Sequence, residues 1–199
     1  MKKWTKKKKG IAAGILALIL VAAGCFLFVN VIQDKLGRVT VYMDGEGGSI
    51  GDVVTVNVKV TDIPEEFQAC SFVISFDEKR LCLQEIDQGN IEVIHKAEDE
   101  TDFPVWQYDV DSANREGSVS VMYLDMTAGD APLCTKGFCK GKKDVLFRMK
   151  FKILSTCAED DVLNLSFAQA TFASVDNEKS LALQKDNLDA KDFQVSVHS

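Results

Sequence analysis

The side chains that could support metal chemistry are few and scattered along the sequence. The chain has two histidines, His95 in a mixed segment and His198 next to the C-terminal residue. A catalytic zinc ion usually takes three protein ligands, commonly histidines, held in fixed geometry. Two isolated histidines do not meet that requirement. The sequence therefore predicts no metal site and no cofactor.

One acidic stretch, DVDSAN at residues 109–114, invites comparison with a calcium-binding loop. Such a loop needs an oxygen ligand at its fifth position, glycine at its sixth and glutamate at its twelfth. This chain has Ala113, Asn114 and Ser120 at those positions. The stretch therefore predicts a polar turn between two strands. Without a convincing nucleophile, paired acid or metal set, we expect the protein not to be an enzyme.

The six cysteines divide by position. Cys25 lies in the apolar N-terminal segment, and Cys70 falls on the inward side of a predicted strand, where a small buried residue is expected. Cys134 and Cys139 are five residues apart and could close a loop in an oxidising exterior. A disulfide between them is one prediction, and two free thiols are the alternative.

The N-terminal 37 residues predict a membrane anchor. Residues 1–10 form a basic tail, and residues 11–32 are apolar except for Asn30. A helix of that length spans roughly 33 Å, enough to cross a bilayer core of about 30 Å. The positive-inside rule places the tail in the cytoplasm, residues 33–37 as a linker and the remainder outside the cell. Cleavage as a signal peptide and lipidation at Cys25 are the alternatives.

Charge is divided unevenly between this segment and the remaining chain. Residues 1–37 hold seven lysines and one aspartate, a net charge of +6, while residues 38–199 hold 16 basic and 29 acidic residues, a net charge of −13. A protein that reads nucleic acid needs a basic surface to displace counterions from phosphates. The acidic C-terminal part therefore argues against nucleic acid as a partner.

The elements expected to position any site are strands. Apolar residues alternate with polar ones over several short segments, separated by glycine, proline or acidic turns. The predicted strands cover residues 38–44, 52–62, 67–76, 81–86, 91–94, 104–110, 118–125, 144–154, 162–173 and 188–197. Residues 127–143 are expected to be irregular. No segment has a sustained helical period, so residues 38–199 predict one all-β sandwich or jelly roll.

The central stretch, residues 67–86, defines two faces most clearly. Cys70, Phe72, Ile74 and Phe76 occupy every second position before a charged corner at residues 77–80. Small residues fill the alternate positions, so one face is predicted to belong to the core and the other to be available for a ligand or partner.

Several of these segments resemble the cohesin domains of cellulosome scaffoldins. The similarity is carried by GDVVTVNV at residues 51–58, by Ile63 and Pro64, by ACSFVISFD at residues 69–77, and by LCL at residues 81–83. Later strands match more loosely, and the resemblance covers essentially residues 38–199. It implies a nine-stranded jelly roll that binds dockerin modules of secreted proteins through one flat sheet face and has no catalytic activity.

On this resemblance, a dockerin partner that carries its own calcium would contact the face away from the core. The residues expected to bind the partner are Ala69, Ser71, Val73, Ser75, Ser118, Ser120 and Met122. Type I cohesins often place Asn and Asp at the positions of Ala69 and Ser71. A small, weakly charged face would bind by shape fit around a few apolar anchors, with hydrogen bonds at the rim.

The sequence thus predicts a cell-surface docking module, and the partners implied are polysaccharide-degrading enzymes. A carbohydrate-binding module on a related sandwich is an alternative, with Trp106, Tyr108 and Tyr123 as the candidate planar aromatics. A structural domain of the cell envelope is the other alternative.

Overall fold

The computed structural model describes residues 39–61, 67–89, 106–124, 144–174 and 176–198, all within one compact unit, Val39–Ser199. Several predictions fall outside these residues: the anchor at 11–32, the strand at 91–94, the irregular segment at 127–143, His95, and the pair Cys134 and Cys139. Among the described residues there is no helix of sufficient length and apolar character to span a membrane.

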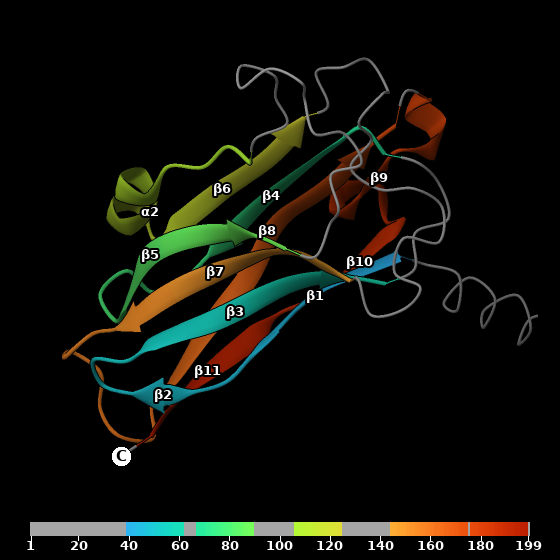
Figure 1. The fold of residues 1–199 in the computed structure, drawn as a ribbon. Coiled ribbons are helices and arrows are strands. Elements are labelled where there is room, and N and C mark those ends of the chain that lie inside the picture. Colours follow the sequence, from blue (N-terminus) through green and yellow to red (C-terminus); the bar gives the residue numbers. More distant parts are fainter. Residues whose placement is uncertain (1–38, 62–66, 90–105, 125–143, 175, 199) are drawn as a thin grey trace, which may run out of the picture. The chain divides into compact units, whose positions relative to one another are not determined.

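The described residues form two β-sheets that pack face to face (Figure 1). The first sheet has the strand order β10-β1-β3-β7-β5, and the second has the order β2-β11-β8-β4-β6, with β9 paired to β8. The strands of the first sheet are β10 (Leu188–Lys191), β1 (Val39–Gly45), β3 (Val53–Val60), β7 (Val145–Ile153) and β5 (Leu81–Gln88). Those of the second are β2 (Gly48–Ser49), β11 (Phe193–His198), β8 (Val162–Ala173), β4 (Ala69–Ser75), β6 (Ser118–Leu124) and β9 (Leu181–Ala182).

The alternation in the sequence sets which side chains enter the core. In β4, Cys70, Phe72 and Ile74 are buried, while the residues between them are only partly covered. β3 and β6 follow the same rule. Aromatic rings join the two layers, since Phe72 of β4 lies 5.6 Å from Phe147 of β7 between ring centroids. The two-layer core predicted from the period-two pattern is therefore confirmed.

The chain passes from one sheet to the other through a glycine-rich segment. β1 pairs with β3 in the first sheet, and β2 pairs in parallel with the end of β11 in the second. A Cβ atom on Gly47 would lie 2.3 Å from the backbone oxygen of Ser196. Only glycine allows these two backbone segments to approach each other this closely.

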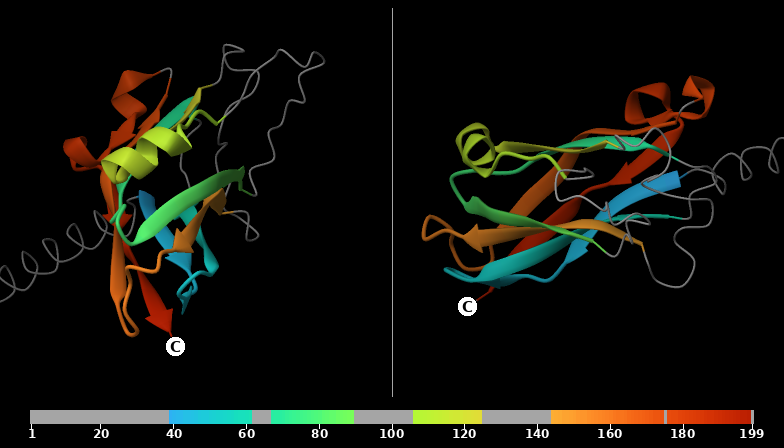
Figure 2. Two further views of the ribbon diagram at one scale, coloured as in Figure 1. Left: turned by 90° about the vertical axis from the view of Figure 1, so that its left-hand side faces the viewer. Right: turned by 45° about the horizontal axis from the view of Figure 1, so that its top comes forward.

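The polar turn predicted between the strands at 104–110 and 118–125 is wrong: residues 110–116 form the helix α2 (Val110–Glu116). Asp109 caps its N-terminus by accepting a hydrogen bond from the backbone N–H of Ser112, and Gly117 ends it in the left-handed conformation at φ +66°. Both are common helix-terminating arrangements. Of the expected hairpin, the described residues retain one antiparallel bridge, between Gln107 and Met122. α2 lies across the edge between β5 and β6 (Figure 2).

The predicted count of nine strands is also wrong, because the described residues hold eleven. The two-residue strands β2 and β9 are too short to give an alternating signal. The segment predicted as one strand at 188–197 is divided at Asp192: β10 pairs with β1, whereas β11 pairs with β8 of the other sheet. Two short 3-10 helices, η1 (Asn177–Lys179) and η2 (Leu183–Lys185), flank β9.

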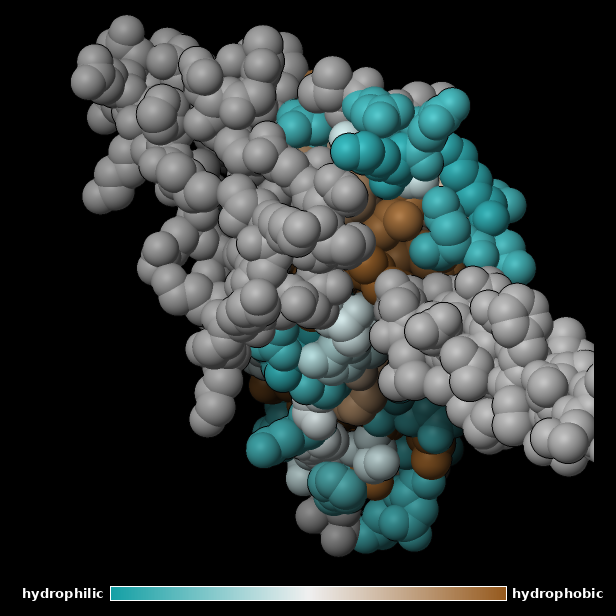
Figure 3. Space-filling model, turned by 90° about the vertical axis from the view of Figure 1, so that its right-hand side faces the viewer, coloured by the Kyte–Doolittle hydropathy of each residue, from teal (hydrophilic) through white to brown (hydrophobic). Residues whose placement is uncertain are grey.

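The two ends of the sandwich differ in character. One end carries α2, β2 and the C-terminal end of β11, and the other carries β9 and the start of β1 (Figures 1 and 2). Leu181 and Leu183, which flank Ala182, pack against the core from the second end. Viewed from there, a hydrophobic area lies among hydrophilic residues (Figure 3).

Candidate functional site

The outer side of β8, β4 and β6 forms a regular grid of small side chains. Cross-strand pairing fixes which residues are neighbours, because residues paired across strands project to the same face. From one end to the other the rows are Ser166–Ser75–Ser118, Gln169–Val73–Ser120, Thr171–Ser71–Met122 and Ala173–Ala69–Leu124. None of these side chains is buried, and we call this surface the uncharged face.

The name reflects a sharp difference between the two sheets. No Asp, Glu, Lys or Arg occurs in any described strand of the second sheet. Every strand of the first sheet contains at least one such residue, as in β7, which has Arg148, Lys150 and Lys152. A charged residue on an outer face adds solubility at little cost to packing. An outer face without any charge is therefore suited to being covered by another molecule.

The structure brings all seven residues predicted to bind a partner onto this one face. Val73 and Met122 provide apolar surface near its middle, and Met122 is 39% exposed. Around them stand the small residues Ala69, Ser71, Ser75, Ser118 and Ser120. Their role in binding remains a prediction.

Sequence reasoning missed the third strand of the face and one apolar residue. Ser166, Gln169, Thr171 and Ala173 of β8 pair with β4, and Leu124 at the end of β6 is 41% exposed. The alternation in β8 is interrupted near Ala168, where the pairing with β4 shifts register between Val73 and Ile74. The sequence of β8 therefore predicts a strand, but it does not predict which strands lie beside it or which of its residues face outward.

A hollow of about 600 Å³ adjoins the face where β6 meets α2. We call it the α2 hollow. It is lined by Val73, Gln107, Tyr108, Asp109, Ser112, Ala113, Glu116, Ser118, Ser120 and Met122. Four of these ten residues belong to the uncharged face, so the hollow continues that surface. Asp109 and Glu116 place two carboxylates beside it.

Hydrogen bonds to β5 hold α2 and its preceding segment in place. The side-chain amide of Asn114 donates to the Leu83 carbonyl at 2.8 Å and accepts from the Leu83 N–H at 2.7 Å. The Tyr108 hydroxyl donates to the Ile86 carbonyl at 2.9 Å. These bonds connect the hollow to the opposite sheet and fix the position of its wall.

The outer side of the first sheet is organised by ion pairs instead. Lys150 of β7 lies 2.7 Å from Asp87 and 2.9 Å from Glu85, both of β5. Hydrogen bonding to Asp87, and then to Glu85, raises the pKa of the Lys150 ammonium. The hydrogen bond from Lys150 is likewise the main cause that lowers the pKa of Asp87. These charges are at least partly exposed, and they are paired within the sheet.

The charged corner between β4 and β5 is held by a further pair. Arg80 Nε donates to Asp77 at 2.7 Å, and the backbone N–H of Lys79 donates to the same carboxylate at 3.0 Å. The hydrogen bond from Arg80 is the largest cause that holds the pKa of Asp77 below its ordinary value. These contacts close the turn that carries the chain from one sheet to the other.

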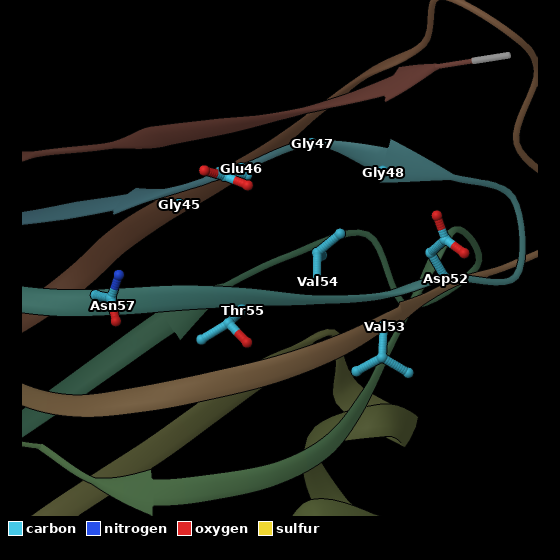
Figure 4. Close-up of a pocket in the computed structure, with 9 residues that line it drawn as sticks. All are labelled: Gly45, Glu46, Gly47, Gly48, Asp52, Val53, Val54, Thr55 and Asn57. Carbon is cyan, nitrogen blue, oxygen red and sulfur yellow. The ribbon is translucent and has the colours of Figure 1, made fainter.

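A second hollow, of about 490 Å³, lies beside the glycine-rich crossing. Its polar side chains, on Glu46, Asp52, Thr55 and Asn57, are spread apart and do not point toward a common centre (Figure 4). The Asp52 carboxylate accepts a hydrogen bond from the N–H of Ser49, which supports the turn. No group of three or more metal-ligating side chains occurs in the described part of the chain.

The aromatic residues considered for sugar binding are mostly internal. Trp106 and Tyr123 are buried against each other, with ring centroids 5.5 Å apart, and Trp106 also contacts Phe147. Tyr108 is 39% exposed. Sugar binding favours exposed planar rings, and two of the three candidates are part of the core. Cys70 is buried as expected, and none of the described cysteines, Cys70, Cys82 and Cys157, forms a disulfide bond.

The described residues thus form a two-layer β-sandwich with one outer face whose strands carry no Asp, Glu, Lys or Arg. A family model for the cohesin domain matches residues 39–185, and the chain therefore belongs to the cohesin domain family. Cohesin domains are protein-binding modules without catalytic activity. A comparison with curated protein sequences gave no significant match.

Solved structures share the fold at low sequence identity. The third cohesin ScaC of Acetivibrio cellulolyticus, in complex with the ScaB dockerin, is 21% identical with a TM-score of 0.61 over 81% of this chain and 99% of its own. The OlpA cohesin of Clostridium thermocellum, in complex with a dockerin, is 19% identical with a TM-score of 0.59 over 81% and 99%. A non-cellulosomal cohesin of the archaeon Archaeoglobus fulgidus is 15% identical with a TM-score of 0.56 over 82% and 93%.

Proposed function

We propose that this protein is a docking module that binds a dockerin on its uncharged face. The observation that carries the proposal is the absence of charged residues from the strands of one sheet, set against charges in every strand of the other. The family and the dockerin complexes of similar structures support the class of partner.

The proposal extends to the setting of the module. The apolar residues 11–32, preceded by a lysine-rich tail, support a retained anchor that presents residues 38–199 outside the cell. A dockerin-bearing polysaccharide-degrading enzyme would then be held at the membrane surface. The calcium needed for binding is expected in the dockerin.

The grid suggests how such a partner would bind. Most of its side chains are small, so a helix or loop of the partner can approach the strands closely. Val73, Met122 and Leu124 provide the apolar contacts, and the serines and Gln169 provide hydrogen-bonding groups around them. Interfaces of this kind depend on a few well-packed apolar anchors and a polar rim.

A binding assay with the full chain in detergent micelles tests the proposal. A panel of recombinant dockerins would be measured by biolayer interferometry with calcium and with a chelator. Val73→Arg places a charge at the middle of the face and should weaken binding of a responsive dockerin at least about thirtyfold. Chelation of calcium should abolish binding by unfolding the dockerin loops, while this chain keeps its thermal midpoint.

The matched control is Thr55→Arg, because Thr55 is an exposed residue of β3 on the outer side of the opposite sheet. It should leave affinity within about twofold of wild type, since it adds the same charge outside the proposed interface. If Thr55→Arg lost affinity and Val73→Arg did not, the interface would lie on the first sheet, and the proposed position of the interface would be wrong. Absence of calcium-dependent binding across the panel would refute the dockerin partner.

A further inference from the structure

We propose that the α2 hollow receives a long basic side chain, Lys or Arg, from the protein that docks on the uncharged face. This inference rests on the proposed docking function and specifies the chemistry that the partner must present at one end of the face. It also assigns Asp109 and Glu116 as specificity-determining residues.

The floor of the hollow is apolar and continuous with the face. Val73 and Met122 belong to both surfaces, and Tyr108 adds an aromatic ring that is 39% exposed. The hydroxyl of Tyr108 is bonded to the Ile86 carbonyl, so this ring is held in position. A partner that covers Val73 and Met122 must therefore also lie over the mouth of the hollow.

The charged residues that line the α2 hollow have a single sign. Of its ten lining residues two are acidic and none is basic. The Asp109 carboxylate accepts one hydrogen bond from the Ser112 N–H, and the Glu116 carboxylate accepts one from the Ser112 hydroxyl at 3.2 Å. A carboxylate has about four acceptor positions, so both groups retain capacity for a ligand. Arg115 also donates to the Ser112 hydroxyl, but it is not among the lining residues.

This combination of surfaces suits a long basic side chain. The aliphatic part of Lys or Arg packs on apolar groups while its charged end stays near water and anions. A guanidinium can also stack on a tyrosine ring and bind carboxylates in a forked arrangement. An acidic side chain would be repelled by Asp109, by Glu116 and by the net negative charge of residues 38–199.

The position of the hollow gives it a part in partner selection. The grid itself carries no charge, so it does not discriminate between partners by electrostatics. The carboxylates beside the α2 hollow would supply that discrimination, and they would orient the partner by fixing which of its ends lies at α2.

The test is a double variant, Asp109→Asn with Glu116→Gln, in the full chain, measured against a dockerin that binds wild type. Asparagine remains a good helix cap and glutamine can still accept from Ser112, so α2 should be preserved. Each carboxylate is solvent-exposed, and we expect a combined loss of affinity of about five- to tenfold. Raising salt from about 50 mM to about 500 mM should weaken wild type more than the double variant.

The matched control is Asp111→Asn with Glu159→Gln, which removes two negative charges from exposed positions outside the hollow. It should stay within about twofold of wild type. Replacing the basic residues of the dockerin one at a time by Gln should identify one whose loss is not additive with the double variant.

The outcomes separate the two proposals. If Val73→Arg abolishes binding and the double variant matches its control at all salt concentrations, the docking function stands and the basic side chain is refuted. If no dockerin binds wild type, the docking function fails and this inference fails with it. If the double variant and its control lose affinity equally, the effect belongs to overall charge, and the assignment of Asp109 and Glu116 is wrong.

Discussion

Asn114 uses both atoms of its side-chain amide to join α2 to β5. It pairs with the N–H and the carbonyl of Leu83, at the place where the pairing between β5 and β7 shifts register between Leu83 and Glu85. A strand at the edge of a sheet leaves backbone groups without a partner strand. One side chain therefore satisfies backbone groups that a neighbouring strand would otherwise bind.

Replacing Asn114 by Ala should destabilise the fold by about 1–3 kcal/mol, because two partly buried backbone groups lose their partners. Chemical denaturation followed by tryptophan fluorescence measures the change, since Trp106 lies in the core. The control is Asn164→Ala, which removes one exposed hydrogen bond to Gln194 and should change stability by less than about 0.5 kcal/mol. Equal effects in the two variants would contradict this role for Asn114.

Asp77 should make stability depend on pH in the acidic range. Its pKa in the folded protein is lowered, first by the hydrogen bond from Arg80, so the ionised carboxylate stabilises the fold. This contribution is fully present above the unfolded value of about 3.9 and is lost as pH falls through the lower folded value. Unfolding by urea from about pH 6 down to about pH 2 should show the difference between wild type and Asp77→Asn shrinking below about pH 4.

An Arg80→Gln background provides the control for that measurement. Without the guanidinium, the main cause of the lowered pKa is absent, and Asp77→Asn should change stability much less. An unchanged effect of Asp77→Asn in that background would show that Arg80 is not the cause.

Among the elements, the crossing from β1 to β2 depends on close contact between backbones. The chain leaves the first sheet after Gly45 and joins β11 of the second at Gly48. Added Cβ atoms would lie 2.5 Å from the Thr55 oxygen at Gly45 and 2.3 Å from the Ser196 oxygen at Gly47. The glycines are required by this proximity as well as by turn geometry.

Gly47→Ala should therefore destabilise the protein more than Gly51→Ala. Gly51 has φ +96° with no atom within 4 Å of an added Cβ, so alanine there costs backbone strain of about 1 kcal/mol. Alanine at Gly47 must displace the backbone of β11. Thermal unfolding by circular dichroism measures both variants, and a smaller loss for Gly47→Ala would contradict the close contact.

The elements also show what could be read from the sequence. Alternation in residues 53–60, 69–75 and 147–153 indicated these strands and their core sides, because one side of each strand lies in the core and the period of two is unbroken over these residues. The helix α2 was missed because seven residues are too few for a helical period, although Asp109 and Gly117 are recognisable caps. The break between β10 and β11 was missed because it is defined by pairing: β10 joins the first sheet and β11 joins the second, and a local sequence pattern does not report which sheet a strand joins.

The same physics limited the site prediction. Residues on β4 and β6 were found because their small or polar side chains alternate with core residues. The contribution of β8 depends on its pairing with β4, about one hundred residues away in sequence, which no local pattern reports. The α2 hollow depends on the packing of a helix that was not predicted.

At the scale of the whole molecule, the last two strands complete both sheets. Residues matched by the cohesin family model end at 185, before β10 and β11. β10 pairs with β1 and β11 pairs with β8, and Leu188, Val195 and Val197 are buried. The fold therefore extends beyond the matched residues.

A fragment of residues 39–199 should unfold cooperatively, whereas a fragment of residues 39–185 should lack a cooperative transition. Without β10 and β11, the shorter fragment exposes the edges of β1 and β8 and loses apolar residues from the core. Circular dichroism and thermal scans of the two fragments give the comparison. A cooperative transition in the shorter fragment would show that the last two strands are dispensable.

The uneven distribution of charge also affects how the free protein behaves in solution. Within the described residues, the strands of the second sheet contribute no Asp, Glu, Lys or Arg to the electrostatic repulsion between copies. That repulsion weakens as pH approaches the sequence pI of about 4.9. Copies without a bound partner should then self-associate through their uncharged faces. A partner bound on that face should keep the protein soluble.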